Sequence, residues 1–126
     1  MPFIHIRSLP LAGRFEAGEA VRAISRHFAA ATGTDERHLT VTWQILEPEH
    51  YSQAGRTAPK QTSDSHPLLV EVLAPDLNEQ DRIEGMLAAT ARAVATQAGV
   101  SPDNVFVDFR AARSGRVFDG GEVARW

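Results

Sequence analysis

Apolar and polar residues alternate along residues 2–7 and again along residues 38–45, which predicts two β-strands. Between them, apolar residues recur every three or four positions over residues 15–32, the spacing of a helix with one core-facing side. Gly33 follows, at the place where a left-handed residue ends many helices. This order predicts a β-α-β unit with parallel strands and a right-handed crossover.

A second unit of the same kind follows a loop. Residues 47–66 contain prolines, a glycine and many serines, threonines and glutamines, which predicts a loop that ends in the linker 57–66. After it, the pattern predicts a strand over residues 68–73, a helix over 79–98 with Asn78 as its N-cap, and a strand over 104–109. The order strand, helix, strand therefore occurs twice.

Matching residues relate the two halves of the chain. Gly33 and Gly99 each follow a predicted helix and are 66 positions apart. Pro67 follows Pro2 by 65 positions, so it mirrors that residue after a slip of one. Such spacing is typical of the duplication of one unit.

We interpret residues 1–126 as one domain in which units 2–56 and 67–122 are copies of each other. The expected fold class is α/β (α+β), with a four-stranded mixed sheet and two helices on one of its faces. The other face of such a sheet would be open. We therefore expect further copies of the chain to cover it in a homo-oligomer.

The composition is that of a soluble domain, with 126 residues of which 43% are hydrophobic and 23% charged. The absence of cysteine excludes disulfides, zinc–thiolate sites and cysteine nucleophiles. A net charge of −3 gives no general attraction to nucleic acid or acidic membranes. No signal peptide or bilayer-spanning run is visible, so we expect a cytoplasmic protein that binds neither nucleic acid nor a membrane. The histidines are not spaced as metal ligands, and neither metal nor cofactor is expected.

Three features in this order resemble the tautomerase superfamily, whose parent group is the 4-oxalocrotonate tautomerase family. They are the start PFIHIRSL with its proline behind the first methionine, the helix-glycine-strand that follows, and the ending GRVFDGGEV over residues 115–123. The resemblance covers almost the whole chain, as a fusion of two family-sized units. It implies a tautomerase/MIF-like fold and a homotrimer with active sites near the amino-terminal prolines.

The resemblance also implies that Pro2 is the catalytic residue. In the family, a free proline amine acts as general base on a small keto/enol or unsaturated carboxylic acid, and some branches use a protonated proline to hydrate, dehalogenate or decarboxylate. Pro2 has this amine only once Met1 is removed, because its nitrogen is otherwise an amide without a basic lone pair. A proline that simply begins a strand is the plainer interpretation.

A carboxylate substrate needs cations, and arginine suits it because the planar guanidinium binds both oxygens. Four arginines are predicted to bind substrate: Arg14, Arg110, Arg113 and Arg116. Arg14 lies near where the family places an arginine, and the other three leave the fourth strand or begin the final hairpin. Tyr51 is the predicted acid, with His50 beside it as a substrate-binding residue, although a packing aromatic at a subunit contact is the plainer interpretation of Tyr51.

The chain departs from the family at the strand arginines. These would fall at about Thr40 and Phe106, or, in the dehalogenase and decarboxylase branches, on the third strand, where Glu71 and Leu73 stand. An enol-diacid substrate and those two activities are therefore disfavoured.

Two alternatives remain open at this point. The same order of elements fits a ferredoxin-like binding module, in which another strand separates the two parallel strands of each unit. A tautomerase-fold protein that has lost activity would bind a small ligand without turning it over. Strand pairing distinguishes the first alternative, and an assay the second.

Overall fold

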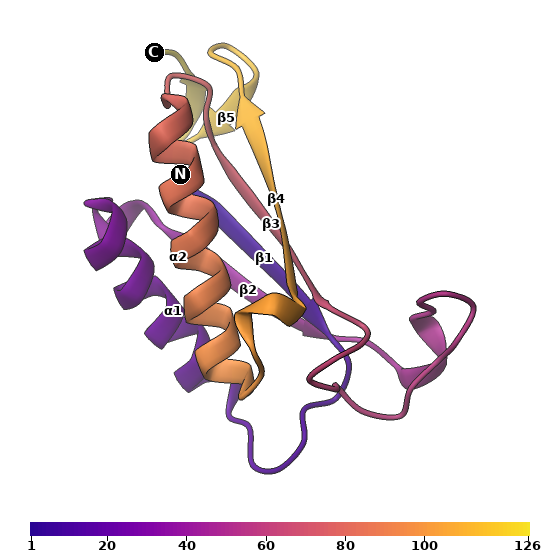
Figure 1. Cartoon of the computed structure of the whole chain (residues 1–126). Helices are drawn as coiled ribbons and strands as arrows, with labels where there is room; N and C mark the ends of the chain where they lie inside the picture. The colour runs from indigo at the N-terminus through magenta and orange to yellow at the C-terminus, as the bar shows by residue number, and fades with distance from the viewer.

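The computed structural model describes residues 1–126 and consists of two helices packed on a four-stranded sheet, with a small hairpin at one end (Figure 1). The strands of the main sheet are β1 (Phe3–Ser8), β2 (Thr40–Ile45), β3 (Leu68–Pro75) and β4 (Val105–Ala112). The helices are α1 (Ala17–Thr32) and α2 (Gln80–Ala98), and the hairpin is formed by β5 (Val117–Asp119) and β6 (Glu122–Ala124). Both helices lie on the same face of the sheet, which confirms the predicted fold class.

The strand order is β2-β1-β3-β4. β1 and β2 pair in parallel, as do β3 and β4, while β1 and β3 pair antiparallel at the centre. The two strands of each β-α-β unit are therefore immediate neighbours. This pairing excludes the ferredoxin-like arrangement.

Alternate residues of the central strands form the core beneath the helices. Ile4 and Ile6 of β1 and Val72 of β3 have no exposed surface, and Phe28 of α1 is also fully buried against this face. Burying an aliphatic or aromatic side chain of this size contributes about 1.5–3 kcal/mol of transfer free energy. The strict alternation of the sequence thus fixes which face of each strand meets the helices.

The helix ends follow the sequence with one correction. Gly33 and Gly99 adopt the left-handed conformation, with φ of 72° and 69°, and end α1 and α2 as predicted. Asn78, however, is not the N-cap of α2: that position is Glu79, which makes no capping side-chain bond. The Asn78 amide instead donates to the Pro75 carbonyl, and its oxygen accepts from Arg82 Nε. This local turn moves the helix start by one residue.

The two β-α-β units correspond more regularly than the sequence predicted. Phe3 pairs with Thr40 in β1–β2, and Leu69 pairs with Phe106 in β3–β4. Each residue of the second pair is 66 positions after its counterpart, the same offset as between the two cap glycines. All four of these side chains belong to the face away from the helices.

A uniform offset of 66 changes the partner of Pro2. The residue equivalent to Pro2 is Leu68, and Pro67 is equivalent to Met1. The predicted slip that matched Pro67 with Pro2 is wrong, because a shift of one residue would turn every strand side chain to the other face. The two prolines thus hold different places in their strands.

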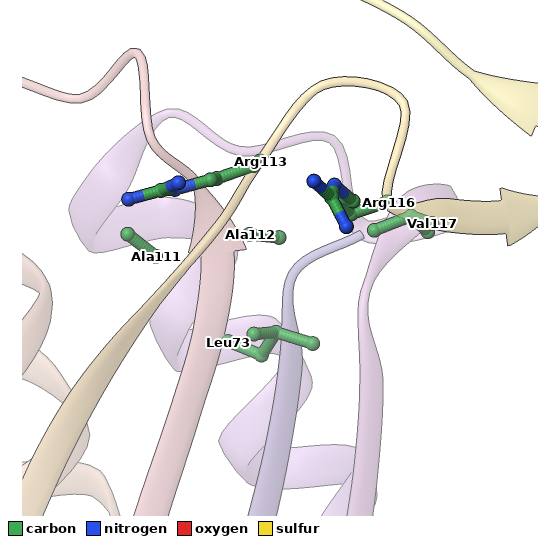
Figure 2. A pocket seen from close by; sticks show the side chains of 6 residues that line it. All are labelled: Leu73, Ala111, Ala112, Arg113, Arg116 and Val117. Carbon is green, nitrogen blue, oxygen red and sulfur yellow. The ribbon is translucent and has the colours of Figure 1, made fainter.

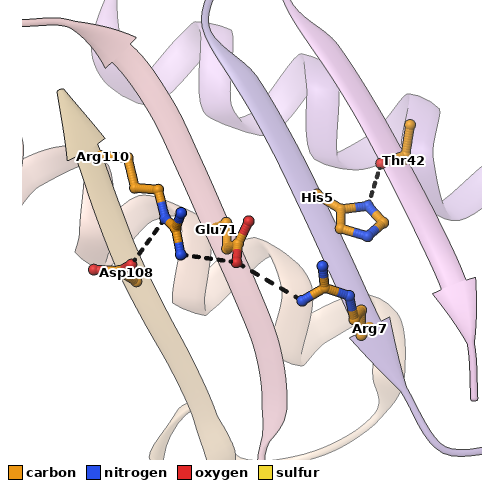
Figure 3. A network of polar contacts seen from close by, with 6 residues as sticks. All are labelled: His5, Arg7, Thr42, Glu71, Asp108 and Arg110. Atoms are coloured by element: carbon orange, nitrogen blue, oxygen red, sulfur yellow. Dashed lines mark hydrogen bonds and ion pairs between the residues drawn. The ribbon is translucent and has the colours of Figure 1, made fainter. Parts of the chain in front are cut away.

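The open face of the main sheet carries a row of polar contacts (Figure 3). Glu71 lies between Arg7 and Arg110, with N–O distances of 3.7 and 3.3 Å, and Arg110 Nε also contacts Asp108 at 3.3 Å. His5 Nδ1 is hydrogen-bonded to the hydroxyl of Thr42. No helix of the structure has the length and apolar composition needed to cross a bilayer, and no group of three potential ligand side chains could hold a metal.

Candidate active site

Pro2 lies buried at the start of β1, where its carbonyl accepts a hydrogen bond of 3.1 Å from the amide of Thr40. The antiparallel partner β3 brings Leu73 opposite Phe3, so the carboxyl ends of β3 and β4 reach the same edge of the sheet. A hollow of about 220 Å³ opens here, lined by Met1, Pro2, Phe3, Thr40, Leu73, Val117, Phe118 and Asp119. The wall beside the proline is therefore mainly apolar, with one hydroxyl and one carboxylate.

A second hollow, of about 450 Å³, adjoins the first and carries two arginines. It is lined by Leu73, Ala111, Ala112, Arg113, Arg116 and Val117. Leu73 and Val117 belong to both hollows, so the two share a wall. Figure 2 shows Arg113 and Arg116 above Leu73, both carried by the turn that joins β4 to β5.

Arg110 reaches the same edge from the open face of the sheet. It lines a hollow of about 360 Å³ together with Phe3, Glu71 and Leu73. Its guanidinium is already engaged with Glu71 and Asp108. Of the predicted arginines near Pro2, Arg113 and Arg116 have no carboxylate partner within salt-bridge distance.

Tyr51 lies at the opposite end of the sheet. β2 runs parallel to β1, so the residues after β2 follow the end of β1, where the amide of Leu46 donates to the carbonyl of Ser8. A six-residue strand spans roughly 20 Å, which separates this end from Pro2. His50 belongs to the same segment, in the short 3-10 helix Pro48–His50.

The Tyr51 hydroxyl already has a partner. It donates to the Pro67 carbonyl at 2.7 Å, and its ring meets the ring of His66 edge-on with centroids 5.1 Å apart. Burial raises the pKa of the Tyr51 phenol above its ordinary value near 10. These contacts anchor the loop after β2 to the start of β3.

Arg14 is also far from Pro2 within one chain. It lies in the connection between β1 and α1, four residues after Pro10, whose carbonyl accepts a hydrogen bond from the amide of Gln61 at this same end of the sheet. Arg14, His50 and Tyr51 can therefore reach Pro2 only if that Pro2 belongs to another copy. One chain brings together Pro2, Arg113 and Arg116, with Arg110 close by.

Sequence reasoning missed the contribution of the final hairpin to the Pro2 hollow. Val117, Phe118 and Asp119 line it, and the sequence predicts only the hairpin itself, whose turn is Gly120-Gly121. Both glycines have positive φ, as a two-residue hairpin turn requires. The two glycines predict a hairpin from the sequence, but they do not predict that it packs against the first strand.

The equivalent end of the first unit lacks this chemistry. At the offset of 66, the positions that correspond to Arg113, Arg116 and Val117 hold Glu47, His50 and Tyr51. The turn Ala54-Gly55, closed by the bridge between Gln53 and Arg56, matches the Gly120-Gly121 turn. The backbone is thus repeated, whereas the paired arginines occur only at the end that holds Pro2.

Comparison with known proteins identifies the fold. No sequence-family profile matches the chain, and no curated protein sequence does. Among solved structures, a fused 4-OT wild-type asymmetric trimer is similar at 15% identity with a TM-score of 0.81, over 97% of this chain and 95% of that one. The structure of Pt0534 inactivated by 2-oxo-3-pentynoate is similar at 14% identity with a TM-score of 0.78, over 97% of this chain and 94% of that one.

A third structure is N1, a member of the cis-3-chloroacrylic acid dehalogenase family, at 14% identity with a TM-score of 0.77, over 97% of this chain and 82% of that one. Such likeness at low identity establishes the fold. The chain has the fold of the tautomerase superfamily, as the resemblance of its sequence implied.

Proposed function

On this tautomerase-superfamily fold, we propose that the chain is a proton-transfer enzyme in which the free amine of Pro2 acts on a small keto/enol or unsaturated carboxylic acid. The observation that carries the proposal is the wall shared by the Pro2 hollow and the Arg113–Arg116 hollow. A molecule with a carboxylate at one end could bind the two guanidinium groups while its reactive carbons lie against Pro2. The volumes of the two hollows, about 220 and 450 Å³, leave room for a small molecule of this kind.

In the proposed reaction, the lone pair of Pro2 takes the proton from an enol hydroxyl, and the prolinium then returns a proton to a substrate carbon. The product is the keto isomer, with no net change in atoms or charge. A base for this step must be unprotonated at the working pH. Neighbouring guanidinium charges and apolar walls both disfavour a protonated amine, and the ring holds the lone pair in a fixed direction.

Arg113 and Arg116 take the place of the strand arginines that the family resemblance implied. Thr40 and Leu73, which stand at two of those positions, both line the Pro2 hollow and carry no charge. In the proposal, the cations come instead from the turn after β4. Arg110 has a secondary role, because Glu71 and Asp108 already compete for its charge.

We further propose that the chain forms a homotrimer, supported by the assembly of the fused 4-OT structure. In a trimer, Arg14, His50 and Tyr51 of one copy could complete the Pro2 site of its neighbour. The open sheet face supports association, because Phe3 and Phe106 expose 39% and 59% of their surface there. Sedimentation equilibrium measures the assembly, and a monomer at micromolar concentration would overturn this part of the proposal.

The activity is tested by the ketonisation of phenylenolpyruvate and of 2-hydroxymuconate, on protein whose intact mass shows that Met1 is absent. We expect turnover of phenylenolpyruvate, which has a single carboxylate, and we expect Pro2→Ala to abolish it. Pro67→Ala is the matched control, because Pro67 is always an amide and should leave turnover intact. Equal rates for the native chain and Pro2→Ala would overturn the proposal, and binding without turnover would favour an inactive ligand-binding protein.

A further inference from the structure

The segment after β6 lies over the turn that carries the two arginines. The amide of Gly115 donates to the carbonyl of Ala124 at 2.9 Å, which joins the turn to the end of β6. The next residue, Arg125, places Nη1 3.0 Å from the position that a Cβ on Gly115 would occupy. The last residue of the sequence, Trp126, donates its own amide to the Ser114 hydroxyl at 2.9 Å.

The Trp126 side chain then connects the turn to the main sheet. Its indole Nε1–H donates to Asp76 Oδ1 at 2.8 Å. Asp76 directly follows β3, and its amide donates to the Ala112 carbonyl at the end of β4, also at 2.9 Å. The bonds therefore run from Ala112 through Asp76 and Trp126 to Ser114, around the backbone of Arg113.

We propose that Trp126 and Asp76 position Arg113 and Arg116 for the substrate carboxylate. This inference rests on the proposed function of the Pro2 site. We call the chain of bonds Asp76–Trp126–Ser114 the tail clamp.

The physical need for a clamp follows from the place of the arginines. Both are exposed and stand on a turn of four residues closed by one bond, in which the amide of Arg116 donates to the Arg113 carbonyl at 3.0 Å. Fixing a long side chain on a mobile turn costs conformational entropy when the ligand binds. A turn already held to β3 and β6 leaves less of this cost to the binding step, so the clamp lowers KM without touching the reacting atoms.

The first experiment measures the clamp without catalysis. Trypsin cleaves after arginine, so limited digestion reports the opening of the turn at Arg113 and Arg116, with Arg56 beside the Ala54-Gly55 turn of the first unit as internal control. Trp126→Phe keeps an aromatic ring but loses the indole donor, and Asp76→Ala loses the acceptor. We expect both variants to speed cleavage at the arginine turn by about fivefold, the effect of one lost hydrogen bond, and to leave cleavage at Arg56 unchanged.

Asp76→Asn is the conservative variant, because its side-chain oxygen still accepts from the indole. It should behave as the native chain. Unchanged cleavage in both Trp126→Phe and Asp76→Ala would overturn the clamp. Faster cleavage at Arg56 as well would show a general loss of stability, which also contradicts it.

The second experiment measures positioning with phenylenolpyruvate. Trp126→Phe and Asp76→Ala should each raise KM by up to about fivefold, the same factor as the opening of the turn, with kcat nearly unchanged, and the double variant should not exceed either single one. In an Arg113→Ala/Arg116→Ala background, Trp126→Phe should have no further effect on KM. An unchanged KM in an enzyme that depends on Pro2 overturns the inference alone.

A native chain without turnover that depends on Pro2 overturns the proposed function instead. The positioning role fails with it, while the digestion result still reports whether the clamp exists. The two failures are therefore distinguishable.

Discussion

His5 of β1 lies directly opposite Glu71 of β3, and the two residues are 66 positions apart. They are the one pair of this antiparallel ladder whose members are each other's equivalents in the duplicated chain. The axis that relates the two halves therefore passes beside them, at the middle of the open face (Figure 3). Each end of the sheet combines the start of one unit with the hairpin of the other, and only the end that holds Pro2 carries the two arginines of the β4–β5 turn.

The two arginines of the turn provide the first prediction. Arg113→Ala and Arg116→Ala should each raise KM for phenylenolpyruvate by about 10- to 100-fold, because a charge-assisted hydrogen bond contributes about 1.5–3 kcal/mol. Steady-state kinetics measures the effect. Arg92→Ala, on the exposed side of α2, is the matched control and should match the native chain. Equal KM values for all three variants would exclude the turn as the carboxylate site.

Tyr51 is predicted to stabilise the chain through its bond to Pro67. Tyr51→Phe should lower the free energy of unfolding by about 1 kcal/mol at neutral pH, the net contribution of one hydrogen bond. Urea denaturation of the two chains measures the difference. If Tyr51 instead serves the Pro2 of another copy, Tyr51→Phe will reduce kcat as well, and the kinetics separate these roles.

The raised pKa of Tyr51 also predicts a pH dependence. In the unfolded chain the phenol ionises near its ordinary pKa, whereas in the folded chain it stays neutral to higher pH. The stability that the neutral Tyr51 phenol contributes to the folded chain is therefore fully present below pH about 10 and is lost as pH rises through the folded pKa. Urea denaturation between pH 9 and 11 should show that the free energy of unfolding falls more steeply with pH for the native chain than for Tyr51→Phe. Identical slopes for the two chains would contradict this prediction.

The cap glycines predict matched costs in the two units. Gly33→Ala and Gly99→Ala should each destabilise the chain by about 1 kcal/mol, because both hold a left-handed conformation that alanine disfavours. Neither site has an atom within 4 Å of an added Cβ, so backbone strain alone sets the cost. Thermal or urea unfolding measures both.

Gly85 is the control for these substitutions. It lies inside α2 with no positive φ, and an added Cβ would meet nothing within 4 Å. Gly85→Ala should therefore stabilise the chain by about 0.5–1 kcal/mol through helix propensity. Clearly unequal costs at Gly33 and Gly99 would argue against equivalent helix ends.

The periodicity of the sequence predicted the elements and their layers correctly, since alternation and helical spacing arise from which side chains meet the core. The helix cap at Asn78 and the residue matched with Pro2 were predicted wrongly. Asn78 has the residue type of a cap, yet its side chain bonds to Pro75 and Arg82 instead. Pro67 looked equivalent to Pro2, but sheet register places Leu68 there.

The candidate site was harder to predict because two units meet to form it. Arg113 and Arg116 lie beside the Pro2 hollow only through the antiparallel pairing of β1 with β3, which local sequence patterns do not encode. The family resemblance predicts a role for Arg14, and residue type predicts one for Tyr51. Parallel pairing of β1 with β2 puts Tyr51 at the far end of the sheet from the Pro2 of its own chain, and the β1–α1 connection does the same for Arg14.

The most direct test of a reactive Pro2 amine is covalent labelling with 2-oxo-3-pentynoate, the compound that inactivated the structurally similar Pt0534. Peptide mass spectrometry locates the adduct, and the labelling rate is compared between the folded chain and the chain in urea. We predict one adduct, on the nitrogen of Pro2, formed faster in the folded chain and together with loss of turnover. An adduct elsewhere, or full turnover after Pro2 is labelled, would contradict the account.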